Sequence, residues 1–284
     1  MAQTFTDFEV ICVNDGSSDN SPAILEKYAM RDPRIRIITQ KNQGVCAARN
    51  RAIAAAGGKY IYPLDSDDKI APTCLEVLFK IITTSRYTAV CPLGYTFNEE
   101  GKTEEWLLPK PTSKNMYSRQ NGLHNSTLFH KSLWEKYGGY DEEFRDIGAE
   151  DFDFFLNFID DNQPVCQTSE RLFYYRQKSP DESRNLLTFR HNYAKLKETL
   201  FAKRPFMRLW HDYYLYAYHS VSRPNTEIKL FGILPLLKIR RKINKTTLRA
   251  FNFMPLLSIE WRRTTIIYRL FDLLPLLSVK HIEK

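Results

Sequence analysis

Residues 8–29 read FEVICVNDGSSDNSPAILEKYA, and they carry the clearest structural signal in this chain. Residues 8–13 are a short apolar run of the kind found in strands that are buried on both faces. Turn-forming residues follow at 14–19, and Ser21 with Pro22 then provides a favourable start for a helix that runs to about residue 30. A strand, a turn and a helix in this order are typical of one unit of an alternating α/β fold.

The same alternation continues further along the chain. The residues IRIIT at 35–39 predict a second strand, and an Ala-rich helix is expected over 43–56, where Gly57 and Gly58 end it. A third strand is expected at 59–64 and a further helix at 72–83. This pattern predicts an α/β fold with a mostly parallel sheet flanked by helices. Ligands of such sheets bind beyond the carboxyl ends of the strands.

Two acidic turns lie at such strand ends. Asp15 follows the first strand, and Asp65, Asp67 and Asp68 follow the third. For Asp15 alone a turn-forming role is the preferred explanation, since Asp side chains bond their own backbone in turns. Three carboxylates within four residues repel one another unless a cation is near, and a hard divalent cation with bound phosphate would fit them. A solvated acidic loop explains the second motif equally well.

A third acidic site, Glu150 and Asp151, precedes the apolar stretch at 152–159. Acids at the start of a helix interact favourably with the helix dipole and with its free N–H groups. That interaction explains one of the two acids in structural terms. The functional alternative is a general base held at a cleft.

These motifs occur in a specific order. Residues 8–29, the motif NQGVCAARN at 42–50, the Asp65-Ser66-Asp67 motif and the Glu150-Asp151 pair together resemble the glycosyltransferases of family 2, which have the GT-A fold. The resemblance covers about residues 3–180. It implies an inverting enzyme that takes a sugar from a nucleotide-sugar, usually a UDP-sugar. The acceptor would be a saccharide or a lipid-linked saccharide in the synthesis of bacterial surface polysaccharide.

The resemblance also implies which residues bind the donor. Asp15 would lie near the base of the nucleotide and Asp65 near the ribose, with Arg49 as a further contact of the nucleotide-sugar. Asp67 would bind Mn²⁺ or Mg²⁺, which bridges the diphosphate. A divalent ion at this point stabilises the charge that develops on the leaving diphosphate.

On the acceptor side, the resemblance makes Asp151 the catalytic base and places Glu150 beside it in acceptor positioning. The base has to lie away from the metal, and the two acidic sites are separate in the sequence. Asn125, Ser126 and residues 131–144 match the region that shapes the acceptor pocket in relatives. Within it, Trp134 and Tyr140 could stack on sugars, although aromatic side chains there are more often part of the core.

The sequence departs from the family pattern in two places. Relatives begin with an additional apolar strand and helix, whereas here Met1 and Ala2 directly precede the matching residues QTFTDFEVI. We therefore expect a lost or mis-called start, and weak or no activity from this chain alone. The alternative function is then a truncated remnant that acts as a membrane-associated interaction module. Lys178 stands where the family often has His, and a plain basic surface loop is the preferred explanation for it.

The C-terminal part of the chain is repetitive. Residues 230–239, 250–259 and 270–279 read LFGILPLLKI, AFNFMPLLSI and LFDLLPLLSV, so the period is 20 residues. Self-similarity at a fixed period predicts an arrayed unit. Proline interrupts a helix, so we expect short helical segments. The expected organisation is a GT-A domain at 1–185, a helical connection at 186–222 and the basic repeats at 223–284.

The repeats also carry the charge. Residues 224–284 contain 12 Lys or Arg and four Asp or Glu, which accounts for the whole net charge of +8. Apolar decamers beside basic residues suit the interface of an anionic membrane, so we expect a cytoplasmic protein bound peripherally to the inner face of the cell membrane. A small all-α annex packed on the first domain is the alternative. Nucleic acid is disfavoured, because stacking aromatic residues do not alternate with the basic ones.

Composition excludes several classes of protein. A chain of 284 residues with 43% hydrophobic residues is long and apolar enough for a core, which excludes wholesale disorder. No window approaches the ~18 consecutive apolar residues of a membrane-spanning helix. The five cysteines form no CxxC pair, which argues against zinc or a redox motif. The first residues also lack the charged and apolar segments of a secretory signal.

Overall fold

The computed structural model describes residues 2–117, 121–177, 184–205 and 207, and six strands between residues 225 and 280. The chain divides into two compact units, residues 1–208 and residues 209–284. We call the first unit the body and the second the tail, and describe each by itself. Lys178 and residues 208–222 of the expected helical connection lie outside the described residues.

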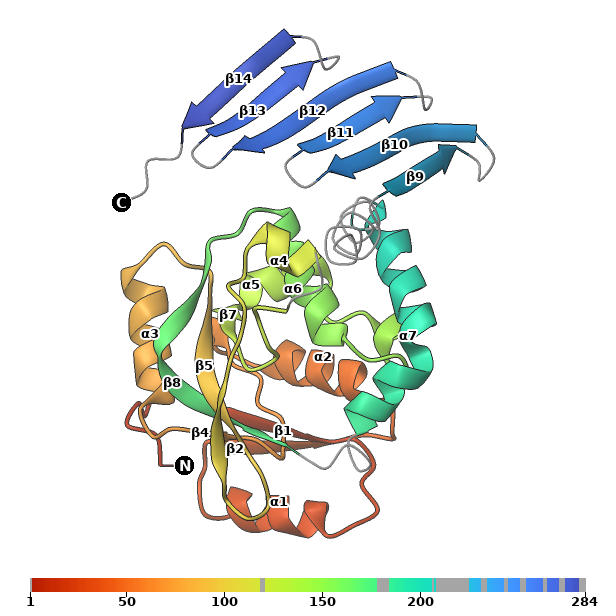
Figure 1. The fold of residues 1–284 in the computed structure, drawn as a ribbon. Helices are drawn as coiled ribbons and strands as arrows, with labels where there is room; N and C mark the ends of the chain where they lie inside the picture. The colour runs from red at the N-terminus through yellow and green to blue at the C-terminus, as the bar shows by residue number, and fades with distance from the viewer. Residues whose placement is uncertain are drawn as a thin grey trace. The chain divides into compact units, whose positions relative to one another are not determined.

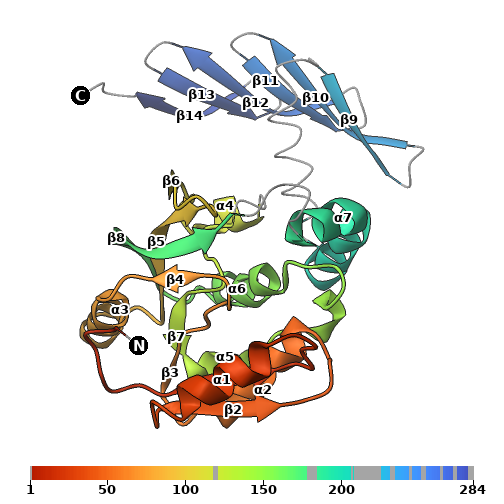
Figure 2. The same cartoon turned by 90° about the horizontal axis from the view of Figure 1, so that it is seen from below.

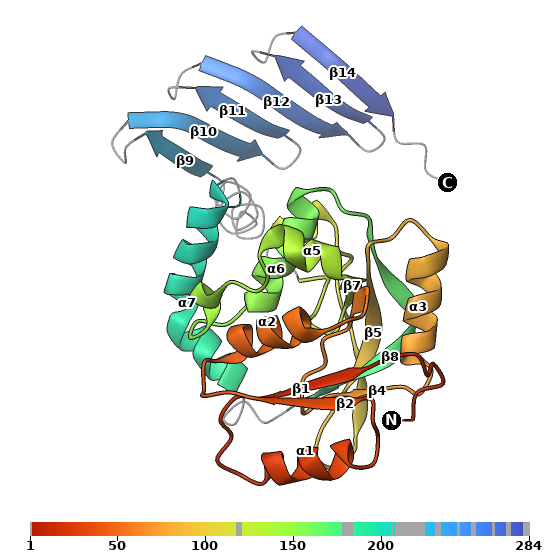
Figure 3. The ribbon, with the colours of Figure 1, turned by 180° about the vertical axis from the view of Figure 1, so that it is seen from behind.

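The body begins with two strand–helix units (Figures 1 and 3). Strands β1 (Val10–Asn14) and β2 (Ile35–Thr39) pair in parallel, and helices α1 (Ser21–Ala29) and α2 (Val45–Ala55) follow them. The Oδ1 atom of Asp19 accepts a hydrogen bond from the backbone N–H of Ser21 (2.9 Å), and Pro22 stands in the first turn of α1. The alternation predicted from residues 8–56 is therefore confirmed, with boundaries that differ by one or two residues.

A second, larger sheet forms the centre of the body (Figure 2). Its strands are β3 (Tyr60–Ile61), β4 (Lys69–Ile70), β5 (Ala89–Phe97), β6 (Thr103–Trp106), β7 (Leu128–His130) and β8 (Val165–Arg176). They lie in the order β3-β7-β5-β8-β4, with β6 beside β5. Of the described pairs in this sheet, only β5 and β8 run in parallel, and the other four pairs are antiparallel.

The prediction of a mostly parallel sheet is therefore wrong for the larger sheet. It rests on the alternation of strands and helices, and that alternation ends with helix α3 (Cys74–Thr84). The next connection, from β5 to β6, is a short hairpin loop at residues 98–102, which returns the chain in the opposite direction. The expected third strand, shortened to β3, joins this larger sheet, while β1 and β2 form a sheet of their own.

Alternate residues of the central strands face two different helices. Val90 of β5 and Leu128 of β7 pack in one buried cluster with Leu78 of α3. Phe129, the next residue of β7, packs in the other cluster with Phe154 of α6 (Glu150–Asp160), at 5.3 Å between ring centroids. Successive residues of a strand point to opposite faces, so α3 and α6 cover opposite faces of the sheet. The phenylalanine core fixes α6, whose first turn carries two predicted site residues.

Four further helices complete the described body. They are α4 (Ser113–Tyr117), α5 (Lys131–Tyr137), the 3₁₀ helix η1 (Glu142–Phe144) and α7 (Arg184–Lys203). Helix α7 falls within the stretch where a helical connection was expected. Of the helices in the described part of the chain, none combines the length and the apolar character needed to cross a membrane.

The tail is a single antiparallel sheet rather than a set of helices. Its strands, in spatial as well as sequence order, are β9 (Asn225–Leu230), β10 (Leu234–Lys242), β11 (Lys245–Ala250), β12 (Met254–Arg262), β13 (Thr265–Leu270) and β14 (Leu274–Lys280). The 20-residue repeat is one β-hairpin, and each proline stands at the second position of a strand. The expectation of a helical tail is wrong because proline is also tolerated at strand starts and bulges.

Candidate active site

Arg49 of α2 joins two of the acidic motifs. Its Nη2 atom donates to Oδ1 of Asp65 (2.8 Å), and its Nη1 atom donates to Oε1 of Glu150 (2.5 Å). The arginine side chain is 13% exposed, and its guanidinium lies 5.4 Å from the centre of the Tyr140 ring. Residues 49, 65 and 150 come from three distant parts of the chain. The structure therefore brings the expected donor side and the expected acceptor side into one cluster.

Asp15 fixes the start of the helix that carries Arg49. Its Oδ1 atom accepts hydrogen bonds from the Gln40 side chain (2.7 Å) and from the backbone N–H of Gln43 (2.8 Å), and its Oδ2 atom accepts one from the backbone N–H of Gly44 (2.8 Å). Burial alone would raise the pKa of the Asp15 carboxyl, but these three hydrogen bonds outweigh burial and lower it. Asp15 thus has a structural role at the end of β1. This role is additional to the nucleotide contact that the resemblance implies.

Asp65 is held by a second side chain besides Arg49. The amide Nδ2 of Asn125 donates to Oδ1 of Asp65 (3.1 Å), and the Tyr140 hydroxyl donates to Oδ1 of Asn125 (3.1 Å). Tyr140 is only 1% exposed and packs against Phe154, at 4.7 Å between ring centroids. Its ring therefore belongs to the core, as expected for most aromatic residues in this region, while its hydroxyl helps to orient the donor-side carboxylate.

Asp151 lies in the first turn of α6, next to the Glu150 carboxylate. Its Oδ1 atom accepts a hydrogen bond from the backbone N–H of Phe152 (2.7 Å). Burial and the negative charge of Glu150 raise the pKa of the Asp151 carboxyl to about 7, and the nearby positive charge of Arg49 opposes this rise. A carboxyl group that titrates near neutral pH can take a proton from a substrate hydroxyl and later release it.

The acidic loop between β3 and β4 is anchored to β8. The backbone N–H of Arg176 donates to Oδ1 of Asp68 (2.9 Å), and the Nε atom of Arg176 donates to the backbone carbonyl of Asp67 (3.0 Å). Burial raises the pKa of Asp68 to about 7, and the neighbouring charges of Asp65 and Asp67 add to the rise. A loop in which several carboxylates crowd together is the environment that a bound cation stabilises.

The donor atoms of this loop suit Mn²⁺ or Mg²⁺, because both ions prefer oxygen ligands. In the described part of the chain, no group of three or more His, Cys, Asp or Glu side chains is arranged to hold a metal ion by itself. The expectation from the resemblance is that one carboxylate, that of Asp67, would share such an ion with a bound diphosphate. His would be the better metal ligand at position 178, but Lys178 lies outside the described residues.

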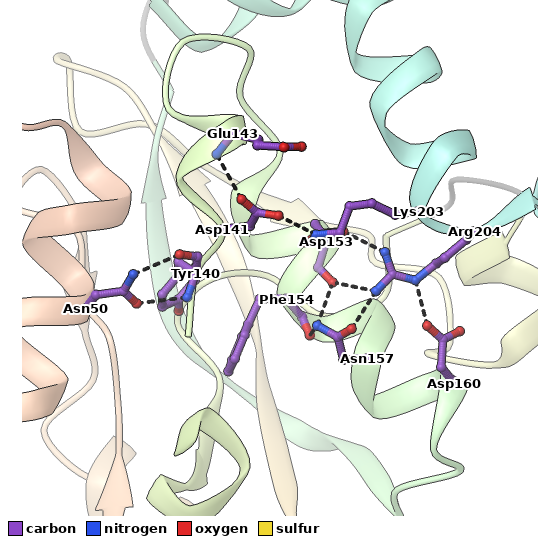
Figure 4. A network of polar contacts seen from close by, with 10 residues as sticks. All are labelled: Asn50, Tyr140, Asp141, Glu143, Asp153, Phe154, Asn157, Asp160, Lys203 and Arg204. Carbon is purple, nitrogen blue, oxygen red and sulfur yellow. Dashed lines mark hydrogen bonds and ion pairs between the residues drawn. The ribbon is translucent and has the colours of Figure 1, made fainter. Parts of the chain in front are cut away.

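Sequence reasoning missed two sets of supporting residues, both visible in Figure 4. Asn50, the last residue of the NQGVCAARN motif, donates to the Tyr140 carbonyl (2.8 Å) and accepts from the Tyr140 N–H (2.8 Å). Asp153 of α6, only 2% exposed, pairs with Lys203 and Arg204 at 2.6 Å each. The one available signal was the presence of an acid in the otherwise apolar segment FDFFLNF.

A cavity of about 440 Å³ lies beside these supporting residues. It is lined by the loop after α5 and by side chains of α2, α6 and α7, namely Asn50, Tyr137, Gly138, Gly139, Tyr140, Asp141, Glu142, Asp153, Asn157 and Lys203. Six of these residues, Tyr137 to Glu142, belong to the stretch 131–144 that was expected to shape the acceptor pocket, whereas none of the expected donor, metal or catalytic residues lines the cavity. The cavity and the cluster around Arg49 share Tyr140, which lines the cavity and also lies 5.4 Å from the Arg49 guanidinium.

Comparisons with known proteins agree with the motifs. Residues 1–137 match the profile described as Glycosyl transferase family 2. The match covers 137 of the 284 residues. EpsH of Bacillus subtilis, named as a glycosyltransferase, is 43% identical over 101 residues, which is 36% of this chain and 29% of EpsH. The chondroitin synthase of Pasteurella multocida is 32% identical over 159 residues, or 54% of this chain and 16% of that protein. The alignments thus span less than a third of either relative.

A solved structure supports the fold. The crystal structure of S. aureus TarS 1–349 in complex with UDP superimposes with a TM-score of 0.57 at 19% identity, covering 78% of this chain and 66% of that one. The predicted GT-A fold is confirmed by this likeness and by the family match. Residues 1–137 are thus similar to glycosyltransferases of family 2, and the curated relatives of the chain include a polysaccharide synthase.

Proposed function

We propose that this chain transfers a sugar from a nucleotide-sugar, most simply a UDP-sugar, to a hydroxyl group of a saccharide or lipid-linked saccharide, with inversion at the anomeric carbon. The observation that carries the proposal is the position of Arg49 between Asp65 and Glu150. One guanidinium thus forms ion pairs with Asp65, which is expected at the donor site, and with Glu150, which is adjacent to the expected base Asp151. The TarS structure with UDP and the chondroitin synthase add support for the donor and for polysaccharide synthesis.

In this proposal, the transfer needs a base and a stabilised leaving group. Asp151 takes the proton of the acceptor hydroxyl while the acceptor oxygen bonds to the anomeric carbon and the bond from that carbon to the diphosphate breaks. Asp67 would hold Mn²⁺ or Mg²⁺, which when bound supplies positive charge to the departing diphosphate. Glu150, fixed by Arg49, would orient the acceptor, and Asp15 and Asp65 would contact the nucleoside.

The raised pKa of Asp151 fits this role. A base works best when its pKa lies near the working pH, because it is then both deprotonated and sufficiently basic. Burial beside Glu150 gives Asp151 that property. Asp65, by contrast, accepts hydrogen bonds from the side chains of Arg49 and Asn125, which fix the position of its carboxylate. The two carboxylates therefore have environments that fit different tasks.

We also propose that the tail binds the anionic surface of a membrane. Residues 224–284 hold the entire net charge of +8, and basic residues near such a surface contribute about 1 kcal/mol each. A protein that acts on lipid-linked acceptors would gain from this placement on the cytoplasmic side of the cell membrane.

A catalytically impaired interaction module is the second candidate. The observation in its favour is that β1, which leads into Asp15, pairs only with β2 among the described strands and is not joined to the sheet that leads into Asp65. Backbone pairing then does not fix the two nucleotide-side carboxylates relative to each other.

Binding of UDP separates the two candidates. Titration calorimetry of the full chain with UDP should show binding that depends on Mn²⁺, and Asp67→Ala should weaken it at least about tenfold. Asp7→Ala, the same change at an exposed position, is the matched control and should bind like the unaltered chain. An absence of Mn²⁺-dependent UDP binding by a folded chain would favour the impaired module.

A further inference from the structure

The tail has two faces that differ in chemistry. Its six strands pair in antiparallel register, so residues opposite each other on neighbouring strands share a face, and successive residues of one strand alternate between faces. In β10, Leu237 lies opposite Ile228 of β9 and Ala250 of β11, whereas Lys238 lies opposite Glu227 and Arg249. The register therefore assigns each residue of the sheet to one of two faces.

The first face is largely apolar: of the described positions that the register assigns to it, only Thr226, Arg241 and Thr246 are polar, and Arg241 and Thr246 pair beside the β10–β11 turn, at the rim of the sheet. The register repeats every 20 residues, so equivalent positions form rows across the sheet, as with Leu237, Leu257 and Leu277. The apolar residues assigned to this face are Ile228, Leu230, Leu234, Leu237, Ile239, Leu248, Ala250, Met254, Leu257, Ile259, Trp261, Ile266, Tyr268, Leu270, Leu274, Leu277 and Val279. Each hairpin contributes the same part of this surface.

The second face is polar and basic. The register assigns to it the cations Lys229, Lys238, Arg240, Lys242, Lys245, Arg249, Arg262, Arg269 and Lys280, against the acids Glu227 and Glu260. The three prolines lie on this face too, as do Thr247 and Ser258. Most of the tail's charge is thus concentrated on one side of the sheet.

A bulge keeps the two faces separate in every repeat. The register shifts by one residue after each proline of the strands β10, β12 and β14. Leu234 and Leu237 stand on either side of the bulge and are three residues apart. In a regular strand, residues separated by an odd number lie on opposite faces, so without the bulge these two would not share a face. The recurrence of the bulge at the 20-residue period preserves one continuous apolar face.

An apolar face of this size needs a covering layer, since a sheet that is apolar on one side is stable only when that side is packed. Six strands about 4.8 Å apart and about six residues long at 3.3 Å each give a face of roughly 600 Å². Two such faces packed together would bury about 1,200 Å² in total, which reaches the range of stable protein interfaces.

We propose that the apolar face of the tail packs against the same face of a second copy of this chain, forming a two-fold symmetric β-sandwich with both basic faces outward. In a two-fold symmetric dimer the same surface of both copies forms the interface, so that surface has to be complementary to itself. Two apolar sheet faces meet this requirement, because sheets pack face to face in β-sandwiches. The charge pattern favours this occupant over the interior of a bilayer. A tail that inserted its apolar face into the membrane would turn its basic face away from the anionic lipid headgroups.

The oligomeric state of the full chain tests the proposal. Sedimentation at a series of protein concentrations should give a closed species of twice the 33.4 kDa chain mass that dissociates on dilution. Leu257→Lys places a charge in the middle of the apolar face and should weaken dimerisation at least about tenfold. Ser258→Lys introduces the same side chain one residue away, on the opposite face, and should leave the dimer intact.

Several results would overturn the proposal. One is a monomeric unaltered chain at all concentrations, a result that needs no variant to fold. Equal effects of the two lysine substitutions would point instead to pairing at the free edges of β9 and β14. Dissociation of the dimer by vesicles of phosphatidylcholine and phosphatidylglycerol, with Leu257→Lys abolishing vesicle binding, would assign the apolar face to the membrane. Circular dichroism should confirm that both variants keep the strand content of the unaltered chain.

Discussion

The Nη1 atom of Arg49 lies 2.5 Å from Oε1 of Glu150, so the guanidinium of α2 forms an ion pair with the acid that stands next to Asp151. The same guanidinium donates to Asp65 through its other nitrogen. One rigid, planar cation thus sets the distance between a carboxylate at the end of β3 and the first turn of α6.

Replacing Arg49 with lysine should lower kcat/KM by about 10- to 100-fold, because an ammonium is a single point charge and cannot bridge two carboxylates in a fixed geometry. Steady-state kinetics with the donor varied, and then with the acceptor varied, would measure the loss on each side. Arg51→Lys, on the exposed face of the same helix, is the matched control and should leave both constants unchanged. Full activity of Arg49→Lys would mean that the bridge has no role in the transfer.

The pH profile should report Asp151. If this carboxyl is the base, kcat/KM rises roughly tenfold per pH unit below its pKa and levels off above it. The pKa of Asp151 is about 7, and Arg49 lowers it from a still higher value. Arg49→Met removes that cation, so the rising limb should move to higher pH. A limb that stays in place in Arg49→Met would assign the titration to another group.

Asp151→Asn should abolish transfer and at the same time stabilise the fold at alkaline pH. The pKa of Asp151 in the folded chain lies above its ordinary value, so the folded state favours the protonated form. The penalty of this carboxylate therefore appears as the pH rises from about 4 towards 7 and is complete above that range. Thermal melts at pH 8 should show a higher Tm for the variant, and melts near pH 4 should show no difference.

Breaking the buried ion pairs of Asp153 should destabilise the body strongly. Asp153→Asn leaves Arg204 and Lys203 without their shared counter-charge in a buried site, which costs about 3 kcal/mol. Asp161→Asn removes an exposed pair with Lys136 and should change stability by less than about 1 kcal/mol. Urea unfolding of both variants measures the difference. Equal midpoints would show that the Asp153 network adds no net stability.

The basic face of the tail should bind anionic vesicles. The full chain should float with vesicles that contain phosphatidylglycerol and stay behind with phosphatidylcholine alone, and added salt should weaken the binding. Reversing two charges with Arg240→Glu and Arg249→Glu should reduce binding about 10- to 100-fold. Lys27→Glu with Arg31→Glu makes the same change in net charge on the body. Equal losses in both double variants would deny the tail a specific part in membrane binding.

Local signals in the sequence predicted local structure well. Strand β2 has the boundaries that IRIIT indicated, because β-branched residues between polar turns leave few alternatives. Helix α6 begins at Glu150, as its acidic first turn indicated. The antiparallel pairing of the larger sheet was missed, since the direction of a strand depends on connections that carry no such signal.

Contacts between distant residues were less accessible. The motifs singled out Arg49, Asp65 and Glu150, but the sequence did not indicate that they touch, because the hydrogen bonds among them join residues 16 and 101 positions apart. No pattern in the sequence pointed to Arg204 as the partner of Asp153. The helical expectation for the tail was wrong for another reason: the alternation of apolar and basic residues at 237–240 indicates a strand, and a proline before it is compatible with a strand start as well as with an interrupted helix.

The period of the tail has a consequence for its length. Because β11 and β13 hold equivalent register positions, excision of residues 245–264 would bring Thr265 opposite Lys242, in the place that Lys245 occupies. Each neighbour would find the same kind of partner, and the sheet would become narrower by one hairpin. Genes for such a chain can therefore gain or lose units of 60 nucleotides and still encode a tail with one apolar and one basic face.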